Sequence, residues 1–145
     1  MIHFMKYLSV TARCATEYRN VKLKDVGLCG LQYSYILNIC RSPGVNQEEL
    51  SHLIHVNKSN VTRQLNVLED NGFIERKTSP SDKRSTLVYP TEKAYDALPE
   101  IHRVLSEWSE LLTEDFTEEE RETLGKMMER ISRKAIAYME GSGNP

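Results

Sequence analysis

The sequence predicts a mainly α-helical fold with a small β-hairpin, an α+β class, on three observations. First, two short helices with capping residues follow each other across a tight turn within residues 46–71. Second, the apolar period changes from that of helices to that of strands at residues 73–89. Third, long amphipathic segments flank this region on both sides. This order of elements is that of a winged helix-turn-helix with added helices at both ends.

The size and composition suit one globular domain. The 145 residues leave no room for a second, enzymatic domain, and 39% apolar with 28% charged residues is ordinary for a folded protein. No apolar run approaches the ~20 residues of a membrane span, and the N-terminus lacks the pattern of a signal peptide. Cys14, Cys29 and Cys40 are odd in number and form no CxxC pair. We therefore expect a cytoplasmic protein with no membrane association.

Positive and negative charges are segregated along the chain, although the net charge is only −2. Residues 55–90 contain six Lys or Arg side chains against four carboxylates, whereas residues 107–122 contain eight carboxylates against Arg121 alone. Residues 1–45 are also basic, with six cationic side chains against two acidic ones. Contact with phosphate groups needs a local basic surface of this kind, so the pattern favours a nucleic-acid partner.

Amphipathic helices are expected at both ends of the chain. The first covers residues 4–19, and a connection at 20–30 leads to a second helix at 31–40. After the hairpin, a fifth helix begins at residues 91–93, and a sixth begins with a capping box at 117–120. We expect residues 31–91 to form the DNA-binding lobe, and residues 1–30 and 92–145 to supply the linker and the dimerisation helices.

The outer helices carry apolar stripes too far from the centre for one chain to bury. Such stripes are expected to pack across the two-fold axis of a homodimer. The alternative is that both pack only within one chain. The residues expected at the dimer interface are Phe4, Leu8, Leu124, Met128, Ile131 and Tyr138.

The central helices divide into an inward and an outward face. Asn46 caps a short third helix that ends near His55, and Asn57 caps a fourth helix at about 58–71. Its apolar positions Val61, Leu65 and Leu68 face inward. The outward side chains suit base edges and phosphates, since Arg fits guanine O6/N7 and Asn or Gln fits adenine N6/N7; the alternative is a merely solvated face. The expected DNA-contacting residues are Asn57, Lys58, Ser59, Asn60, Thr62, Arg63 and Gln64.

This region resembles the core of the MarR family of winged helix-turn-helix regulators. The matching segments are NQEEL (46–50), NKSNVTR (57–63), LEDNGFIER (68–76) and DKRS (82–85). Helices of suitable length extend the resemblance over nearly the whole chain. The family pattern is broken at Cys29, Pro90 and Ala94, where Thr, Leu and Gly are usual.

The resemblance implies a homodimeric transcriptional regulator that binds an inverted-repeat operator in double-stranded DNA. We expect this regulator to be a repressor. The fourth helix would enter the major groove and the hairpin, residues 73–77 and 86–89, would reach the minor groove as a wing. Arg84 would enter that groove, and Asp82 would hold the arginine in position. The wing residues expected at DNA are Arg76, Lys77, Asp82, Lys83 and Arg84.

The resemblance leaves the mode of regulation open. Family members respond to a small aromatic ligand, to thiol oxidation or to a metal. Tyr18, Tyr33 and Trp108 could line a ligand cleft, as could Tyr35 and His102, although core packing explains them equally well.

Neither a redox nor a metal site is indicated by the residues themselves. Cys14, Cys29 and Cys40 are expected to pack in the structure, and no carboxylate or Cys cluster completes a metal site with His52 and His55. We expect no cofactor, no metal and, since no catalytic motif is present, no enzymatic activity. A winged helix that binds protein instead of DNA is the remaining alternative.

Overall fold

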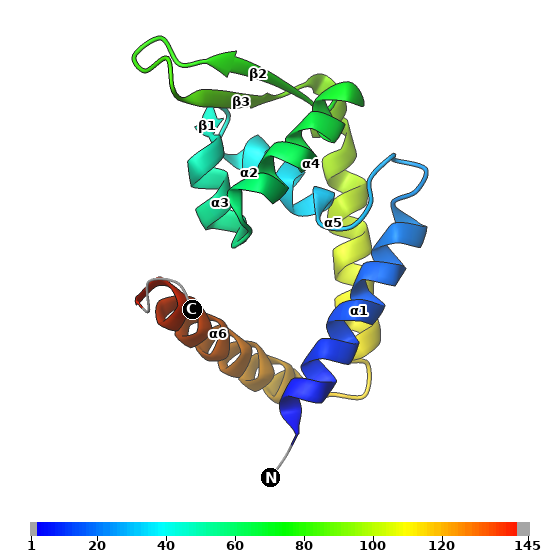
Figure 1. Ribbon diagram of the computed structural model, residues 1–145. Coiled ribbons are helices and arrows are strands. Elements are labelled where there is room, and N and C mark those ends of the chain that lie inside the picture. Colours follow the sequence, from blue (N-terminus) through cyan, green and yellow to red (C-terminus); the bar gives the residue numbers. More distant parts are fainter. Residues whose placement is uncertain (1–2, 142–145) are drawn as a thin grey trace. The chain divides into compact units, whose positions relative to one another are not determined.

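The computed structural model describes residues 3–141, and the chain divides into two compact units, Met1–Trp108 and Ser109–Pro145. The first unit contains, in chain order, α1 (Phe4–Lys22), α2 (Gln32–Arg41), β1 (Val45–Asn46), α3 (Gln47–Ile54), α4 (Lys58–Asp70), β2 (Ile74–Thr78), β3 (Thr86–Pro90) and α5 (Glu92–Leu112), whose last residues enter the second unit (Figure 1). The second unit contains α6 (Glu118–Gly141). The mainly helical winged fold that the sequence predicts is confirmed.

Side-chain caps define the helix-turn-helix. Asn46 and Glu49 form the predicted capping box of α3, and the side chain of Asn57 accepts the backbone N–H of Asn60 at the start of α4 (2.8 Å). Between the two helices His55 adopts a left-handed conformation (φ 59°), which ends α3 and turns the chain. The predicted helix boundaries in this region hold to within a residue or two.

The end of α4 forms a Schellman motif around Gly72. Gly72 has φ +80°, the backbone N–H of Phe73 reaches the carbonyl of Leu68 (2.9 Å), and that of Gly72 reaches Glu69 (3.0 Å). Phe73 and Leu68 are both fully buried. The predicted left-handed end of this helix is therefore confirmed, and it delivers the chain directly into β2.

The sheet has one strand more than the sequence predicts. Strands β2 and β3 pair antiparallel as the expected hairpin, and the two-residue strand β1 pairs with the other edge of β3, in the order β1-β3-β2. Val45 lies opposite Val88, and both are buried. The extra strand fixes the base of the wing to the start of α3.

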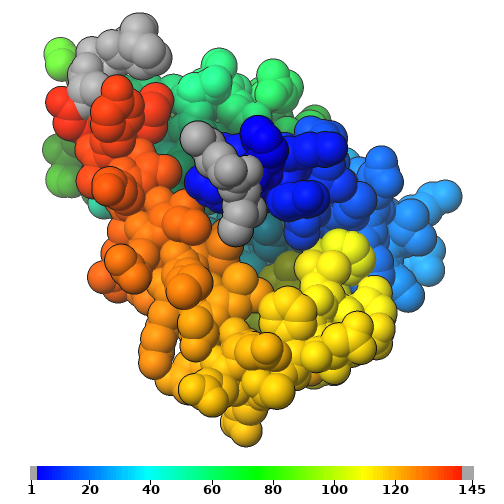
Figure 2. Space-filling view, turned by 90° about the horizontal axis from the view of Figure 1, so that it is seen from below, coloured from blue at the N-terminus to red at the C-terminus, as the bar shows by residue number. Residues whose placement is uncertain are grey.

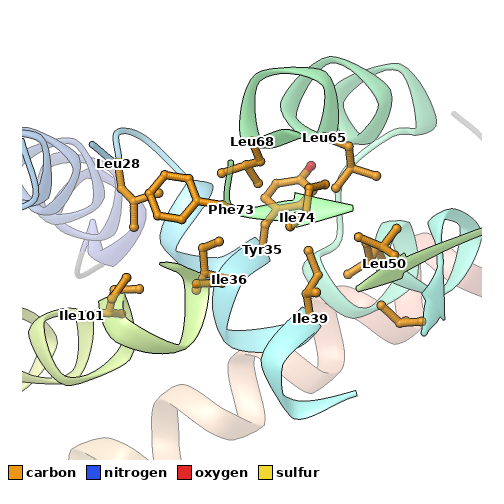
Figure 3. Close-up of a cluster of buried hydrophobic side chains, with 14 of the residues drawn as sticks. Leu28, Tyr35, Ile36, Ile39, Leu50, Leu65, Leu68, Phe73, Ile74 and Ile101 are labelled. Carbon is orange, nitrogen blue, oxygen red and sulfur yellow. The ribbon is translucent and has the colours of Figure 1, made fainter. Parts of the chain in front are cut away.

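One apolar core joins the helix-turn-helix to the sheet and to α5. Helices α2 and α4 face each other across it, and the hydroxyl oxygen of Tyr35 points toward the helix that carries Leu65 (Figure 3). The core also contains Leu23 and Leu28 from the predicted connection. Among the described residues, none of the helices combines the length and apolar character needed to cross a membrane.

Helices α1 and α5 lie side by side in the first unit, where Tyr18 stacks on Trp108 with ring centroids 4.6 Å apart (Figure 1). Helix α5 continues through Pro99 and buries Ala94, Ala97, Ile101 and Val104. By contrast, α6 has no buried residue, and its side chains, drawn in orange, line the surface in Figure 2. Phe4, Met5 and Tyr7 at the start of α1 are exposed as well.

Candidate nucleic-acid interface

The outward face of α4 is polar and cationic near its N-terminal end. Val61, Leu65 and Leu68 are at most 1% exposed, as predicted, and hold the helix against the core. This orientation leaves the following side chains exposed near the N-terminal end of the helix: Lys58, Ser59, Thr62 and Arg63. Because that end also carries the positive pole of the helix, the face is suited to phosphate groups and base edges.

Asn57, Asn60 and Gln64 are engaged within the protein as well. The side-chain oxygen of Asn57 accepts from the Asn60 backbone and from the Ser59 hydroxyl, both at 2.8 Å. Asn60 and Gln64 are half-buried and bond to helix α2. Asn57 is thus a helix cap, while the other two lie at the edge of the outward face.

Two side chains of α2 support α4 from inside. The hydroxyl of Tyr35 donates to Asn60 Oδ1 (2.7 Å), and Gln32 Nε2 donates to Gln64 Oε1 (3.2 Å). Burial raises the pKa of Tyr35 to about 12, an effect that the nearby positive charge of Arg63 opposes. The sequence analysis did not predict a role for Gln32. Its position beside the inward residues of a helix was a signal, because a buried Gln side chain needs a hydrogen-bond partner.

The wing tip presents Lys83 and Arg84, both exposed. Asp82 Oδ1 accepts the backbone N–H of Arg84 (3.0 Å), and the carbonyl of Asp82 accepts the N–H of Ser85 (3.0 Å). Asp82 therefore shapes the backbone of the loop. Among the described contacts, no ion pair joins its carboxylate to the Arg84 guanidinium.

Arg76 and Lys77 lie away from the tip, on β2. Arg76 donates from Nη2 to Glu69 Oε1 (3.0 Å) and from Nε and its backbone N–H to Glu69 Oε2, which lowers the pKa of Glu69. Lys77 sits over the ring of Tyr89, 5.1 Å from its centroid. Both cations thus have intramolecular contacts, and Arg76 ties β2 to the end of α4.

A groove of about 460 Å³ separates the helix-turn-helix from the wing. Its walls come from the start of α3, the start of α4 and the base and tip of the wing. The groove contains both exposed cations Lys58 and Arg84 and the acids Glu48 and Asp82; the remaining lining residues are Asn46, Gln47, Val61, Thr62, Ser85 and Thr86. Lys58 Nζ lies 3.6 Å from Glu48 Oε1, an exposed pair that a phosphate could displace at little cost.

The remaining candidate residues show no assembled site. Among residues 3–141, no three His, Cys, Asp or Glu side chains are arranged to hold a metal, and His52 and His55 are exposed. The expectation that all three cysteines pack is wrong for Cys14, on α1, and for Cys29, in the connection before α2, because both are exposed. Cys40 is half-buried, and burial raises the pKa of its thiol.

Comparisons with known proteins point to one family. The sequence profile described as "MarR family" matches residues 31–86, the segment that contains the groove. The chain is 29% identical over 133 residues to YybA, an uncharacterised HTH-type transcriptional regulator of Bacillus subtilis, covering 92% of this chain and 89% of that protein.

Solved structures agree over the whole fold. The crystal structure of a MarR protein is 34% identical, with a TM-score of 0.83 over 93% of this chain and 98% of the other. A Listeria monocytogenes protein assigned to the same family, crystallised with a 26mer DNA, is 26% identical, with a TM-score of 0.89 over all of this chain and 98% of the other.

Proposed function

Since the chain belongs to the MarR family of transcriptional regulators, we propose that it binds an inverted-repeat operator as a homodimer and represses transcription from it. The observation that carries this proposal is the groove between α4 and the wing. A cationic side chain lies on each of its walls, Lys58 on the helix and Arg84 on the loop, and Arg63 and Lys83 are exposed on the same two elements. One phosphate backbone in the groove would place α4 in the major groove and the wing in the adjacent minor groove.

The crystallised Listeria relative supports this mode of binding, because that protein was obtained with a 26mer DNA. Asn57, Lys58, Ser59, Asn60, Thr62, Arg63 and Gln64 would serve the major groove. Of these, Asn57 acts by capping the helix, so that the free N–H groups of its first turn face the phosphates. Lys83 and Arg84 would serve the minor groove, with Asp82 ordering the loop.

The apolar surfaces of the terminal helices support the homodimer. On α6, Leu124 and Ile131 are 39% and 38% exposed, and Met128 on the same face is partly exposed. Phe4 on α1 is 49% exposed. Water-facing apolar stripes of this length are costly in a monomer, and the two-fold symmetry of the proposed operator requires a second copy. Leu8 and Tyr138 extend the same stripes.

We further propose that a small aromatic anion releases the operator. Arg19 is 9% exposed, lies 4.6 Å over the centroid of the Tyr33 ring, and its Nε has no hydrogen-bond partner among the described residues. A buried guanidinium with an unused donor favours a carboxylate partner. Of the predicted ligand-lining residues, Tyr18 lies next to Arg19 on α1 and stacks on Trp108 of α5. Tyr35 belongs to the core, and His102 is exposed.

Selection of bound sequences from a random duplex pool tests the proposed function. We expect enrichment of an imperfect inverted repeat whose half-sites lie about 10 bp apart, because two recognition helices related by a two-fold axis reach successive major grooves. Recovery of no sequence, with no salt-dependent binding to random duplex, would contradict DNA binding and favour a protein partner. Recovery of isolated half-sites would contradict the symmetric dimer.

A further inference from the structure

Gln32 and Gln64 form a hydrogen-bonded chain that begins at the protein backbone. The N–H of Cys29 donates to Gln32 Oε1 (2.9 Å), and Gln32 Nε2 donates to Gln64 Oε1 (3.2 Å). Gln32 is 4% exposed and lies in the first turn of α2. Gln64 is half-buried at the edge of the outward face of α4. The chain thus connects the entrance of α2 to the middle of the recognition helix.

The backbone fixes the direction of every bond in this chain. A backbone N–H can only donate, so the group of Gln32 that meets Cys29 must be its carbonyl oxygen. The amide NH2 of Gln32 then faces Gln64, and only the carbonyl oxygen of Gln64 can receive it. The NH2 of Gln64, on the other branch of the same planar amide, is then the group of this side chain that remains to donate.

We propose that Gln64 acts in DNA recognition as a hydrogen-bond donor that favours a base with an acceptor in the major groove over cytosine, and that Gln32 is the positioning residue that sets this preference. Guanine O6 and N7, adenine N7 and thymine O4 are acceptors, whereas cytosine presents only the N4 donor. Reading a donor such as cytosine N4 would need the amide oxygen of Gln64 to accept a second hydrogen bond beside that of Gln32. The inference rests on the proposed function, because it requires α4 to lie in the major groove.

Asn60 provides a contrast on the same helix. Its partner is the hydroxyl of Tyr35, a group that can donate or accept. The Asn60 amide can therefore turn over without losing its internal hydrogen bond. The constraint on base choice belongs to Gln64, whose partner is held by a backbone group.

Binding to a panel of operators with all four bases at each half-site position tests the inference. Full-length wild type, Gln64→Ala, Gln32→Met and Asn66→Ala would be compared, the last being an exposed control on the same helix. The position that Gln64 reads is the one where Gln64→Ala loses discrimination. There, wild type should bind guanine, thymine and adenine about tenfold more tightly than cytosine. Gln32→Met should reduce this preference at the same position and leave the other positions unchanged.

Each alternative outcome has a separate meaning. Preference for cytosine at the Gln64 position, or a Gln64→Ala variant that loses discrimination nowhere, would overturn the inference while leaving the proposed function intact. A folded Gln32→Met variant that weakens binding to every sequence equally would overturn the role of Gln32. If Gln32→Met does not fold, the wild-type base preference alone decides. Absence of sequence-dependent binding by wild type would overturn the proposed function and this inference together.

Discussion

Arg76 and Glu69 form a two-point ion pair between β2 and the last turn of α4, with Arg76 Nη2 3.0 Å and Nε 3.3 Å from the two carboxylate oxygens. The backbone N–H of Arg76 adds a third bond to the same carboxylate (3.0 Å). A side chain held in this way is not free to follow a phosphate. The pair instead fixes the angle at which the wing leaves the recognition helix.

Arg76→Ala should therefore lower stability without changing the salt dependence of DNA binding. We expect a loss of about 1 kcal/mol or less in the free energy of unfolding, because the Glu69 side chain is 37% exposed. Glu69→Gln should destabilise in the same direction. Chemical denaturation and a salt titration of operator binding measure the two effects, and a shallower salt slope for Arg76→Ala would instead make Arg76 a phosphate contact.

The same pair has a defined pH dependence. Its hydrogen bonds lower the pKa of Glu69, so the contribution to stability is complete above the ordinary carboxyl pKa and is lost as the pH falls through the lowered value. The difference in unfolding free energy between wild type and Glu69→Gln should accordingly shrink on acidification. A difference that stays constant from neutral to acid pH would contradict this assignment.

Tyr35→Phe should destabilise the lobe by about 1 kcal/mol, because it removes the bond to Asn60 Oδ1 from a fully buried site. Folding raises the pKa of Tyr35 from 10.0 to about 12, so the stabilising effect of the neutral hydroxyl is complete below pH 10 and is lost as the pH rises through 12. Wild type should thus lose stability in alkali more steeply than Tyr35→Phe. Tyr95→Phe, at a position 46% exposed, is the matched control and should behave like wild type.

Asp82→Asn should bind the operator at least as tightly as wild type, whereas Asp82→Ala should bind more weakly. Asp82 contacts the Arg84 backbone, and an Asn oxygen can accept the same N–H while removing a negative charge from the DNA-facing loop. Equilibrium binding of the two variants distinguishes a role of Asp82 in ordering the loop backbone from an effect of its charge. Equal losses for Asn and Ala would mean that the carboxylate acts on the Arg84 guanidinium in the complex.

Ile131→Glu should convert the dimer to a monomer, because it places a charge within the apolar stripe of α6. Ala137→Glu adds the same charge to an exposed position about 120° around this helix from Ile131 and should remain dimeric. Sedimentation or light scattering measures the mass directly. A dimeric Ile131→Glu protein would place the interface elsewhere.

Local sequence patterns predicted the features that depend only on residues close together in the chain. The inward triplet of α4, the caps Asn46 and Asn57, and the left-handed turn at Gly72 are all set within one or two helical turns, and the structure confirms each of them. The hairpin followed from the change of apolar period. The basic loop was predicted between the two strands, and residues 80–84 do lie outside the paired strands.

Contacts between residues far apart in the chain could not be predicted from local sequence patterns. Strand β1 is two residues long and exists only because Val45 meets Val88, far along the chain. Arg76 is predicted at DNA from its place in the wing, and its bond to Glu69 depends on how β2 packs against the end of α4, which residue spacing does not show. Likewise, the inward bonds of Asn60 and Gln64 depend on how α2 crosses α4, a tertiary relationship that periodicity does not encode.

The salt dependence of operator binding by wild type and Arg84→Ala tests most directly the claim that the wing and α4 together bind DNA. Arg84 is assigned to the minor groove, where it gains affinity from the phosphates and carries little sequence information. Arg84→Ala should weaken binding to every sequence and make the slope of log affinity against log salt shallower by about one unit, with the ranking of half-sites preserved. An Arg84→Ala protein with unchanged affinity and slope, or with an altered half-site preference alone, would contradict the account.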